Sequence, residues 1–119
     1  MKMKLDPCPT SPNCVCSFDT PKSDSHYIKP IRLRRKTQGL ANLYEYLDAR
    51  KDCTVLAKKA NYIKAVFVTS ILRFKDDVEF LLADNGRTLH VRSASRVGYS
   101  DLGKNRRRIE SMRSTIEKL

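Results

Sequence analysis

The sequence contains no apolar run that approaches the roughly 20 residues needed to cross a bilayer. Its best candidate, residues 65–72, is short and is interrupted by Thr69 and Ser70. The first residues, Met-Lys-Met-Lys-Leu-Asp-Pro, lack the apolar stretch of a secretory signal. We therefore expect a soluble protein without a membrane span, cytoplasmic as the sequence stands.

Signatures of catalysis are also missing. There are two histidines, His26 and His90, and no Gly-x-Ser-x-Gly, phosphate-cradling glycine loop or His-Glu-x-x-His motif. Asp76 and Asp77 are adjacent, but neighbouring strand residues point to opposite faces and do not form a carboxylate pair. We predict no catalytic residue and no cofactor.

The sequence has four cysteines, and Cys8, Cys14 and Cys16 crowd the N-terminal part of the chain. Their spacing, C-x5-C-x-C, matches no common zinc site, even with His26 as a fourth ligand, so we predict no metal. A Cys8–Cys14 disulfide is the alternative in an oxidising compartment, whereas these residues stay thiols in the cytosol. Cys53 begins a predicted strand and is expected to pack.

Positively charged residues clearly outnumber negatively charged ones in this sequence. The 119 residues include 24 Lys+Arg against 13 Asp+Glu, a formal net charge of +11. The excess lies in residues 29–36, which have five cations and no acid, and in residues 85–113, which have eight cations and two acids. A basic excess suggests an anionic partner. Because the two runs lack interleaved aromatic residues, apart from Tyr99, and match no standard motif, we expect only weak, nonspecific binding to nucleic acid.

The length allows one domain with an irregular N-terminal arm. All five prolines fall within the first 30 residues, so residues 1–36 are predicted to form a Pro-rich arm that wraps the domain or stays mobile. Residues 37–119 are predicted to form a single α+β domain. Thr37 is a candidate N-cap for a first amphipathic helix, whose stripe is Leu40, Leu43, Tyr44 and Leu47.

Alternating β-branched and aromatic residues predict four strands, at residues 53–59, 62–70, 77–83 and 87–93. A last helix is predicted from Ser100 or Asp101, with an apolar stripe that starts at Leu102 and with Arg107 and Arg108 pointing away from it. The fold class is therefore α+β: a four-stranded antiparallel meander, α-β-β-β-β-α, with two helices on one face and the Pro-rich arm.

Asn85-Gly86, between the last two predicted strands, is a strong hairpin signal, because a type I′ turn needs positive φ at both central residues. Counting outward from this turn gives the register. The predicted pairs are Leu82 with Leu89, Phe80 with Val91, Val78 with Ser93, Leu81 with His90, and Glu79 with Arg92. We expect Glu79 and Arg92 to form an exposed cross-strand ion pair.

With both helices on one side, the other face of the sheet carries a mixture of polar and apolar side chains. They include Tyr62, Val66, Val68, Leu81 and His90. This mixture is too apolar to be left bare, so we expect the arm, a second copy, a protein partner or a ligand to cover it. Of these, the sequence favours a homo-oligomer or a protein partner docked on the open sheet face.

Two stretches carry a resemblance to a known family. The first is Cys-Pro-Thr-Ser-Pro-Asn-Cys-Val at residues 8–15, with His-Tyr-Ile-Lys-Pro at 26–30. The second runs from Phe-Lys-Asp-Asp-Val-Glu-Phe at 74–80 through Arg-Ser-Ala-Ser-Arg-Val-Gly-Tyr-Ser-Asp-Leu-Gly at 92–103 to Asn-Arg at 105–106. Together they closely resemble the uncharacterised family called domain of unknown function 1499, found in bacteria and plant plastids. The resemblance implies no established activity, and it implies a periplasmic or lumenal location for relatives that carry targeting sequences. Where the family usually has Ser, this sequence has Cys16.

The richest polar cluster lies where the last strand leads into the last helix. The candidate ligand-binding residues are Arg92, Ser93, Ser95, Arg96, Tyr99, Asp101, Asn105 and Arg106. Arginines beside the amides of a helix N-terminus suit a carboxylate or phosphate. In the alternative, Arg96 or Arg106 pairs with an aspartate inside the fold. We expect a small basic binding or interaction domain, non-enzymatic, and keep as alternatives a small-molecule enzyme or an anion sensor at the same junction.

Overall fold

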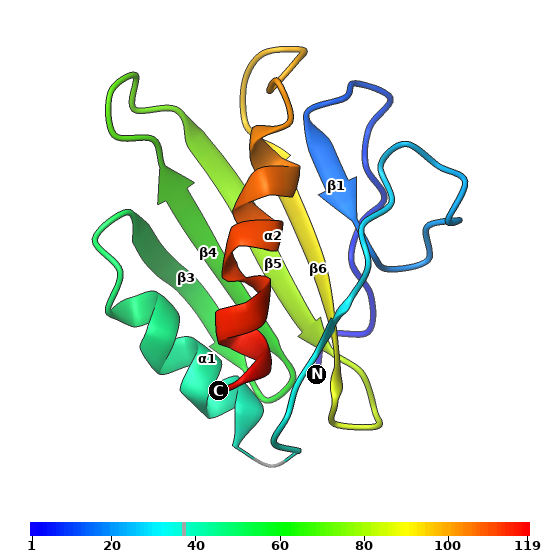
Figure 1. The fold of residues 1–119 in the computed structure, drawn as a ribbon, viewed down its shortest axis with the longest axis vertical. Helices are drawn as coiled ribbons and strands as arrows, with labels where there is room; N and C mark the ends of the chain where they lie inside the picture. Colours follow the sequence, from blue (N-terminus) through cyan, green and yellow to red (C-terminus); the bar gives the residue numbers. More distant parts are fainter. Residues whose placement is uncertain (37) are drawn as a thin grey trace.

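The computed structural model describes residues 1–36 and 38–119. Four of its strands are each antiparallel to the next along the chain: β3 (Cys53–Lys59), β4 (Tyr62–Val68), β5 (Lys75–Leu82) and β6 (Thr88–Ser95). Helix α1 (Gly39–Asp48) precedes them, and helix α2 (Lys104–Glu117) follows them (Figure 1). Thr37, the predicted N-cap of the first helix, lies outside the described residues.

The described residues form a sheet of six strands, where the sequence predicted four. The additional strands, β1 (Cys14–Cys16) and β2 (Ile31–Arg32), come from the first 36 residues, and both pair antiparallel with β6. Proline cannot donate to a ladder, but neither segment contains one, so both can satisfy the backbone groups along the β6 edge. The prediction of an irregular arm was wrong for these two segments.

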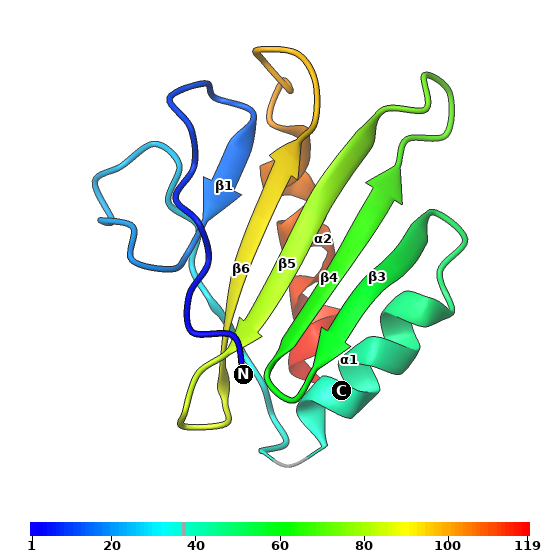
Figure 2. The ribbon, with the colours of Figure 1, turned by 180° about the vertical axis from the view of Figure 1, so that it is seen from behind.

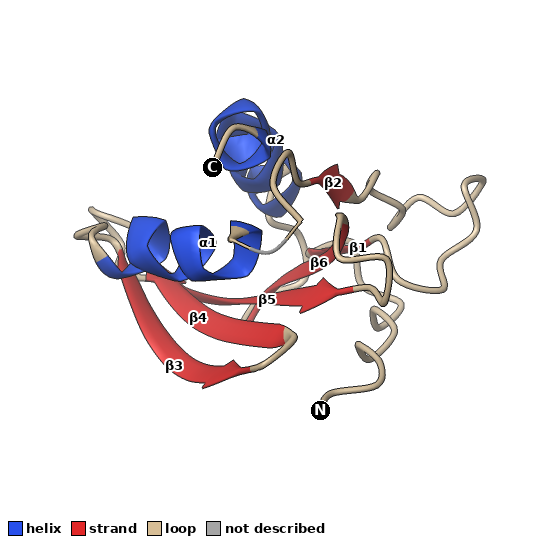
Figure 3. Ribbon diagram, turned by 90° about the horizontal axis from the view of Figure 1, so that it is seen from below, coloured by secondary structure: helices blue, strands red, loops and turns tan. Residues whose placement is uncertain are grey.

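Both helices lie on one face of the sheet, as Figure 3 shows. The hydrophobic core between the layers includes Leu43 of α1, Phe80 of β5 and Ile109 of α2. Ile31 and Leu33, from the arm, are buried in the same core. Burying a side chain of this size stabilises a protein by about 1.5–3 kcal/mol. The arm therefore contributes directly to the packing of the α+β body.

The arm also covers part of the opposite face of the sheet (Figure 2). Leu5 of the arm is buried in a second apolar cluster with Tyr62 and Leu81 of the sheet. Phe18, also from the arm, packs edge-on against His90, with ring centroids 5.3 Å apart. The sequence predicted that the arm, a second copy, a protein partner or a ligand covers this face. In the structure, the arm covers the region around Tyr62 and Leu81.

The hairpin of β5 and β6 has the predicted register, with Leu82 opposite Leu89. The predicted turn type was wrong. Within the pair Asn85-Gly86, only Gly86 has a positive φ, of 71°, and its N–H donates to the carbonyl oxygen of Ala83 at 2.9 Å. The turn is therefore longer than the expected two residues, but it is centred on the same pair, and the register is unchanged.

The two hairpin strands extend further than predicted at their other end. β5 begins at Lys75 and β6 ends at Ser95, and the added pairs are Asp76 with Ser95 and Asp77 with Ala94. Alternation along β5 then turns Asp76 toward the helices, where it is fully buried, and leaves Asp77 on the other face.

Helix α2 begins at Lys104, later than the predicted start at Ser100 or Asp101. Gly103, with φ 79°, precedes it in the left-handed region. Leu102 was predicted to start the apolar stripe, but it lies before the helix and is 84% exposed. Among the described residues, no helix is long and apolar enough to cross a membrane.

Candidate functional site

Asn105, in the first turn of α2, connects the strand-to-helix junction. Its fully buried side-chain amide donates to Ser95 Oγ at 2.9 Å, to Asp101 Oδ2 at 2.8 Å and to the carbonyl oxygen of Asn13 at 3.2 Å. Its amide oxygen accepts a hydrogen bond from Ser93 Oγ at 2.6 Å. Four of the predicted ligand-binding residues, Ser93, Ser95, Asp101 and Asn105, are thus bonded together in one network.

Asp101 caps helix α2. Its Oδ1 accepts the N–H of Gly103 at 2.8 Å, and its Oδ2 accepts the N–H of Asn105 at 3.1 Å. Burial acts to raise the pKa of Asp101, but the hydrogen bonds from Asn105 and Gly103 outweigh it and hold that pKa below its usual value. The carboxylate of Asp101 therefore occupies the N-terminus of α2, where the sequence analysis predicted a site for an anionic ligand.

Asp76 lies beside this network, between β5 and α2. Its Oδ2 accepts a hydrogen bond from Arg108 Nη2 at 2.5 Å and lies 3.0 Å from Lys104 Nζ. The prediction that Arg108 points away from the core was wrong, because its long side chain reaches back from the flank of the helix and also donates to Asn105 Oδ1 at 2.8 Å. Asp76 Oδ1 is buried and accepts no hydrogen bond from the described residues.

Two arginines of the predicted site are engaged within the fold. Arg96 donates to both carboxylate oxygens of Asp77, at 2.9 and 3.0 Å. This pairing holds the pKa of Asp77 below its usual value. Arg106 donates to the carbonyl oxygen of Ser25 in the arm at 3.0 Å. Neither side chain is directed to a common anion site.

The third arginine, Arg92, lies beside Glu79, with 3.8 Å between Arg92 Nη1 and Glu79 Oε1. The two side chains are only 16% and 13% exposed, so the expectation of an exposed pair was wrong. The arm explains the difference, because Arg92 Nη2 donates to the carbonyl oxygen of Pro7 at 3.4 Å. Glu79 also accepts a hydrogen bond from the hydroxyl of Tyr62.

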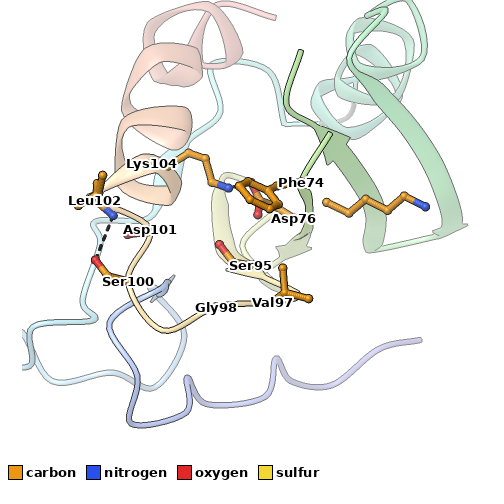
Figure 4. Close-up of a pocket in the computed structure, with 10 residues that line it drawn as sticks. Phe74, Asp76, Ser95, Val97, Gly98, Ser100, Asp101, Leu102 and Lys104 are labelled. Atoms are coloured by element: carbon orange, nitrogen blue, oxygen red, sulfur yellow. Dashed lines mark hydrogen bonds and ion pairs between the residues drawn. The ribbon is translucent and has the colours of Figure 1, made fainter. Parts of the chain in front are cut away.

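A pocket of about 240 Å³ opens next to the network, between the start of β5, the end of β6 and the loop that leads into α2 (Figure 4). Its apolar walls are Phe74, Val97 and Leu102, and Asp76 and Lys104 also line it. The ammonium of Lys104 lies 5.6 Å from the centroid of the Phe74 ring. The pocket thus combines an apolar wall with a buried, charged group.

Sequence reasoning found part of this pocket and missed the rest. Ser95 and Asp101 line it, whereas the side chain of Tyr99 is exposed outside it. Phe74 was missed, although it stands first in the second stretch of family resemblance, and that position was a usable signal. Lys104 gave no signal, because its contact with the sheet depends on the start of the helix, which was predicted too early.

The cysteines separate into one disulfide and two thiols. The structure joins Cys8 and Cys14, with their Cα atoms 5.7 Å apart. Cys16 and Cys53 are buried thiols, and burial raises the pKa of both, that of Cys53 to about 11. Such thiols are weak nucleophiles at neutral pH. Within the described residues, no three His, Cys, Asp or Glu side chains gather where they could hold a metal ion.

A family model matches nearly the whole chain. The model described as "Protein of unknown function (DUF1499)" matches residues 4–116. No curated protein and no solved structure matches the chain. The matched range includes the disulfide, all strands of the sheet, the pocket and nearly all of α2. Because it takes in almost the whole chain, the protein belongs to the DUF1499 family.

Proposed function

We propose that this protein is a non-enzymatic binding domain, and that its ligand occupies the pocket at the strand-to-helix junction. The observation that carries the proposal is Asp76 Oδ1, a buried acceptor without a donor from the described residues. Leaving such a group unpaired costs about 1–3 kcal/mol, which a ligand N–H or O–H can recover. The pocket therefore suits a small molecule with an apolar body and at least one hydrogen-bond donor.

The distribution of charge favours a neutral or cationic donor over an anion. The three arginines of the predicted site are bonded elsewhere, and Asp101 already caps α2. Lys104 lines the pocket, but its ammonium is paired with Asp76. An anionic ligand would have to compete with Asp76 for this cation.

The positions of the histidines support binding over catalysis. His90 lies on the other side of the sheet, where its Nδ1 is 3.1 Å from Ser17 Oγ. His26 lies in the arm, bonded to Asp24 and to the backbone of Ser11. Neither residue lines the pocket, so neither is placed to act as a general base there.

An NMR titration of the labelled protein tests the proposal. The probes are benzylamine and benzyl alcohol, which offer a donor, and benzoate and inorganic phosphate, which are anions. We expect the two donor probes to shift the amide signals of Ser95, Gly98 and Lys104. Asp76→Asn should weaken the binding of benzylamine about tenfold or more, since a hydrogen bond to a charged group is lost.

Two further variants control the titration. Asp77→Asn changes the same side chain on the opposite face of the same strand, so it should leave benzylamine binding unchanged. Phe74→Ala removes part of the apolar wall without breaking a buried ion pair, and it should weaken both donor probes. Shifts with benzoate or phosphate alone would favour the anion sensor, and no shift with either donor probe would refute the proposal.

Weak, nonspecific adhesion to nucleic acid is a second candidate, favoured by the exposure of a basic run. Arg34, Arg35 and Lys36 are consecutive and exposed, and none forms an ion pair with a carboxylate of the described residues. Anisotropy titrations of single- and double-stranded oligonucleotides at increasing salt measure this adhesion. Arg34→Ala/Arg35→Ala should lower the salt slope by about two. An absence of binding at low salt would remove this candidate.

A further inference from the structure

Two loops at one end of the molecule carry large apolar side chains into solvent. They are residues 69–74, between β4 and β5, and residues 96–103, between β6 and α2 (Figures 1 and 2). Their exposed apolar side chains, here called the apolar crown, are Ile71, Leu72, Phe74, Val97, Tyr99 and Leu102. The loops adjoin, because Phe74 of one and Val97 of the other line the same pocket.

The packing of the fold does not account for the apolar crown. Ile71 is 86% exposed and Leu102 is 84% exposed, so neither adds appreciably to the core. Each loop also holds a residue other than glycine in the left-handed region, Arg73 at φ 59° and Leu102 at φ 54°. Apolar side chains that are grouped on a surface in this way mark an interaction site.

Unpaired cations lie around the apolar crown. Arg73 and Lys75 are exposed on either side of Phe74, and Arg107 is exposed next to the other loop, where it donates to the carbonyl oxygen of Leu102 at 2.6 Å. None of these three cations forms an ion pair with a carboxylate of the described residues. The surface therefore combines apolar tips with a positive rim.

We propose that the apolar crown binds the surface of an anionic lipid bilayer. Ile71, Leu72 and Tyr99 enter the boundary between headgroups and acyl chains, while the surrounding cations contact lipid phosphates. The exposed cations beside the apolar crown attract the protein to such a surface. Projecting loops fit a fluid surface, whereas a protein partner or a second copy needs a preformed complementary surface.

Phe74, Val97 and Leu102 of the apolar crown also line the pocket, but the two proposals are tested with different residues. Ile71, Leu72 and Tyr99 do not line the pocket, and Asp76 is too deeply buried to touch a bilayer. Failure of the probe titration would therefore leave membrane binding unaffected. Failure of membrane binding would likewise leave the pocket proposal intact.

A vesicle flotation assay with the full chain and its disulfide intact tests the proposal. Vesicles of phosphatidylcholine with about one third phosphatidylserine are compared with pure phosphatidylcholine over a range of salt. We expect binding to the anionic vesicles that weakens as salt rises. Ile71→Ser/Leu72→Ser should lower the affinity about tenfold, and Arg73→Ala should lower it about fivefold. Leu56→Ser, at an exposed position in the middle of β3, is the matched control and should bind like the unsubstituted protein.

Three outcomes would overturn the proposal. One is no binding to anionic vesicles even at low salt. Another is equal affinity of the unsubstituted protein and Ile71→Ser/Leu72→Ser, which would reduce the effect to adhesion by charge. The third is a dimer in light scattering that this double variant abolishes, without vesicle binding, which would assign the apolar crown to a second copy. Melting curves verify that the variants fold.

Discussion

The substitution Asn105→Ala tests whether the buried network holds the junction together. The side chain of Asn105 hydrogen-bonds to Ser95 of β6, to Asn13 of the arm and to Asp101, which caps α2. Among the residues described for this junction, no other side chain contacts all three parts. Alanine has the higher helix propensity, so intrinsic preference alone would predict stabilisation of α2. Loss of the hydrogen-bond network predicts the opposite, a fall in the free energy of unfolding.

The magnitude follows from which groups are left without partners. Ser93 is fully buried and loses the acceptor of its hydroxyl hydrogen, at a cost of about 1–3 kcal/mol. The other partners are less affected: Asp101 keeps the N–H of Gly103, and the carbonyl of Asn13 keeps the N–H of Ser95. Arg108 Nη1 loses Asn105 Oδ1 but keeps Ser93 Oγ, at 3.3 Å. Their lost bonds add about 1 kcal/mol. The free energy of unfolding should therefore fall by about 2–4 kcal/mol, which lowers Tm by about 6–20 °C at this chain length.

Denaturant and thermal unfolding followed by circular dichroism measure this change. Asn105→Leu keeps the branched shape and the number of side-chain heavy atoms, so it separates the loss of side-chain atoms from the loss of hydrogen bonds. We expect it to be as damaging as Asn105→Ala. Ser114→Ala, on the exposed side of the same helix, should change stability by less than about 0.5 kcal/mol. If Asn105→Leu melted at the temperature of the unsubstituted protein, the reasoning from unpaired polar groups would be refuted.

Three further predictions concern the arm, the loop before α2 and the covered face of the sheet. Cys8→Ser/Cys14→Ser should lower the free energy of unfolding by about 2 kcal/mol, the value expected for so short a closed loop, and reductant should then have no further effect on the melt. Leu102→Asn should leave stability unchanged or raise it by up to about 1 kcal/mol, because Asn tolerates φ near 54° and the exposed leucine packs little; a clear loss in denaturant unfolding would contradict this. Burial lowers the pKa of His90, so the folded state disfavours its charged form, and stability should fall as pH drops below the unfolded value of about 6.5. Denaturant unfolding between about pH 7 and pH 5 should show a smaller fall in His90→Gln, and an unchanged slope in that variant would refute the assignment.

The central hairpin could be predicted because its information is local. Alternation along β5 and β6 defines two faces, and the position of Asn85-Gly86 fixes which residues lie opposite one another. An error in turn type did not propagate, since the turn remained centred on the same pair. The register depends on that centre and on the apolar pattern, which agree.

The strands of the arm could not be predicted in the same way. β1 and β2 have three and two residues, too few for a period of two to be visible. They exist because the edge of β6 offers unpaired backbone groups, and because Val15 and Ile31 can be buried beside it. Both reasons depend on the tertiary structure.

The candidate site shows a limit of helical periodicity. The angular position of Arg108 lies outside the apolar stripe of α2, yet its guanidinium reaches Asp76 over the edge of the helix. Periodicity gives the direction of Cβ, whereas an arginine carries its charge several bonds further. The prediction that Asp76 and Asp77 face opposite sides of the strand was confirmed, and it is this alternation that buries Asp76.

The positions of the unpaired charges make the two proposed adhesive surfaces separable. The side chain of Lys36 lies against Gly86 in the turn between β5 and β6, at the end of the molecule opposite the apolar crown (Figure 1). The molecule is 38 Å long, several times the Debye length of about 8 Å at physiological salt. The basic run therefore adds little attraction to a bilayer that the apolar crown contacts. Arg34→Ala/Arg35→Ala should weaken oligonucleotide binding alone, and Ile71→Ser/Leu72→Ser should weaken vesicle binding alone. A variant that weakened both equally would mean that the net charge of +11, and no particular surface, drives adhesion.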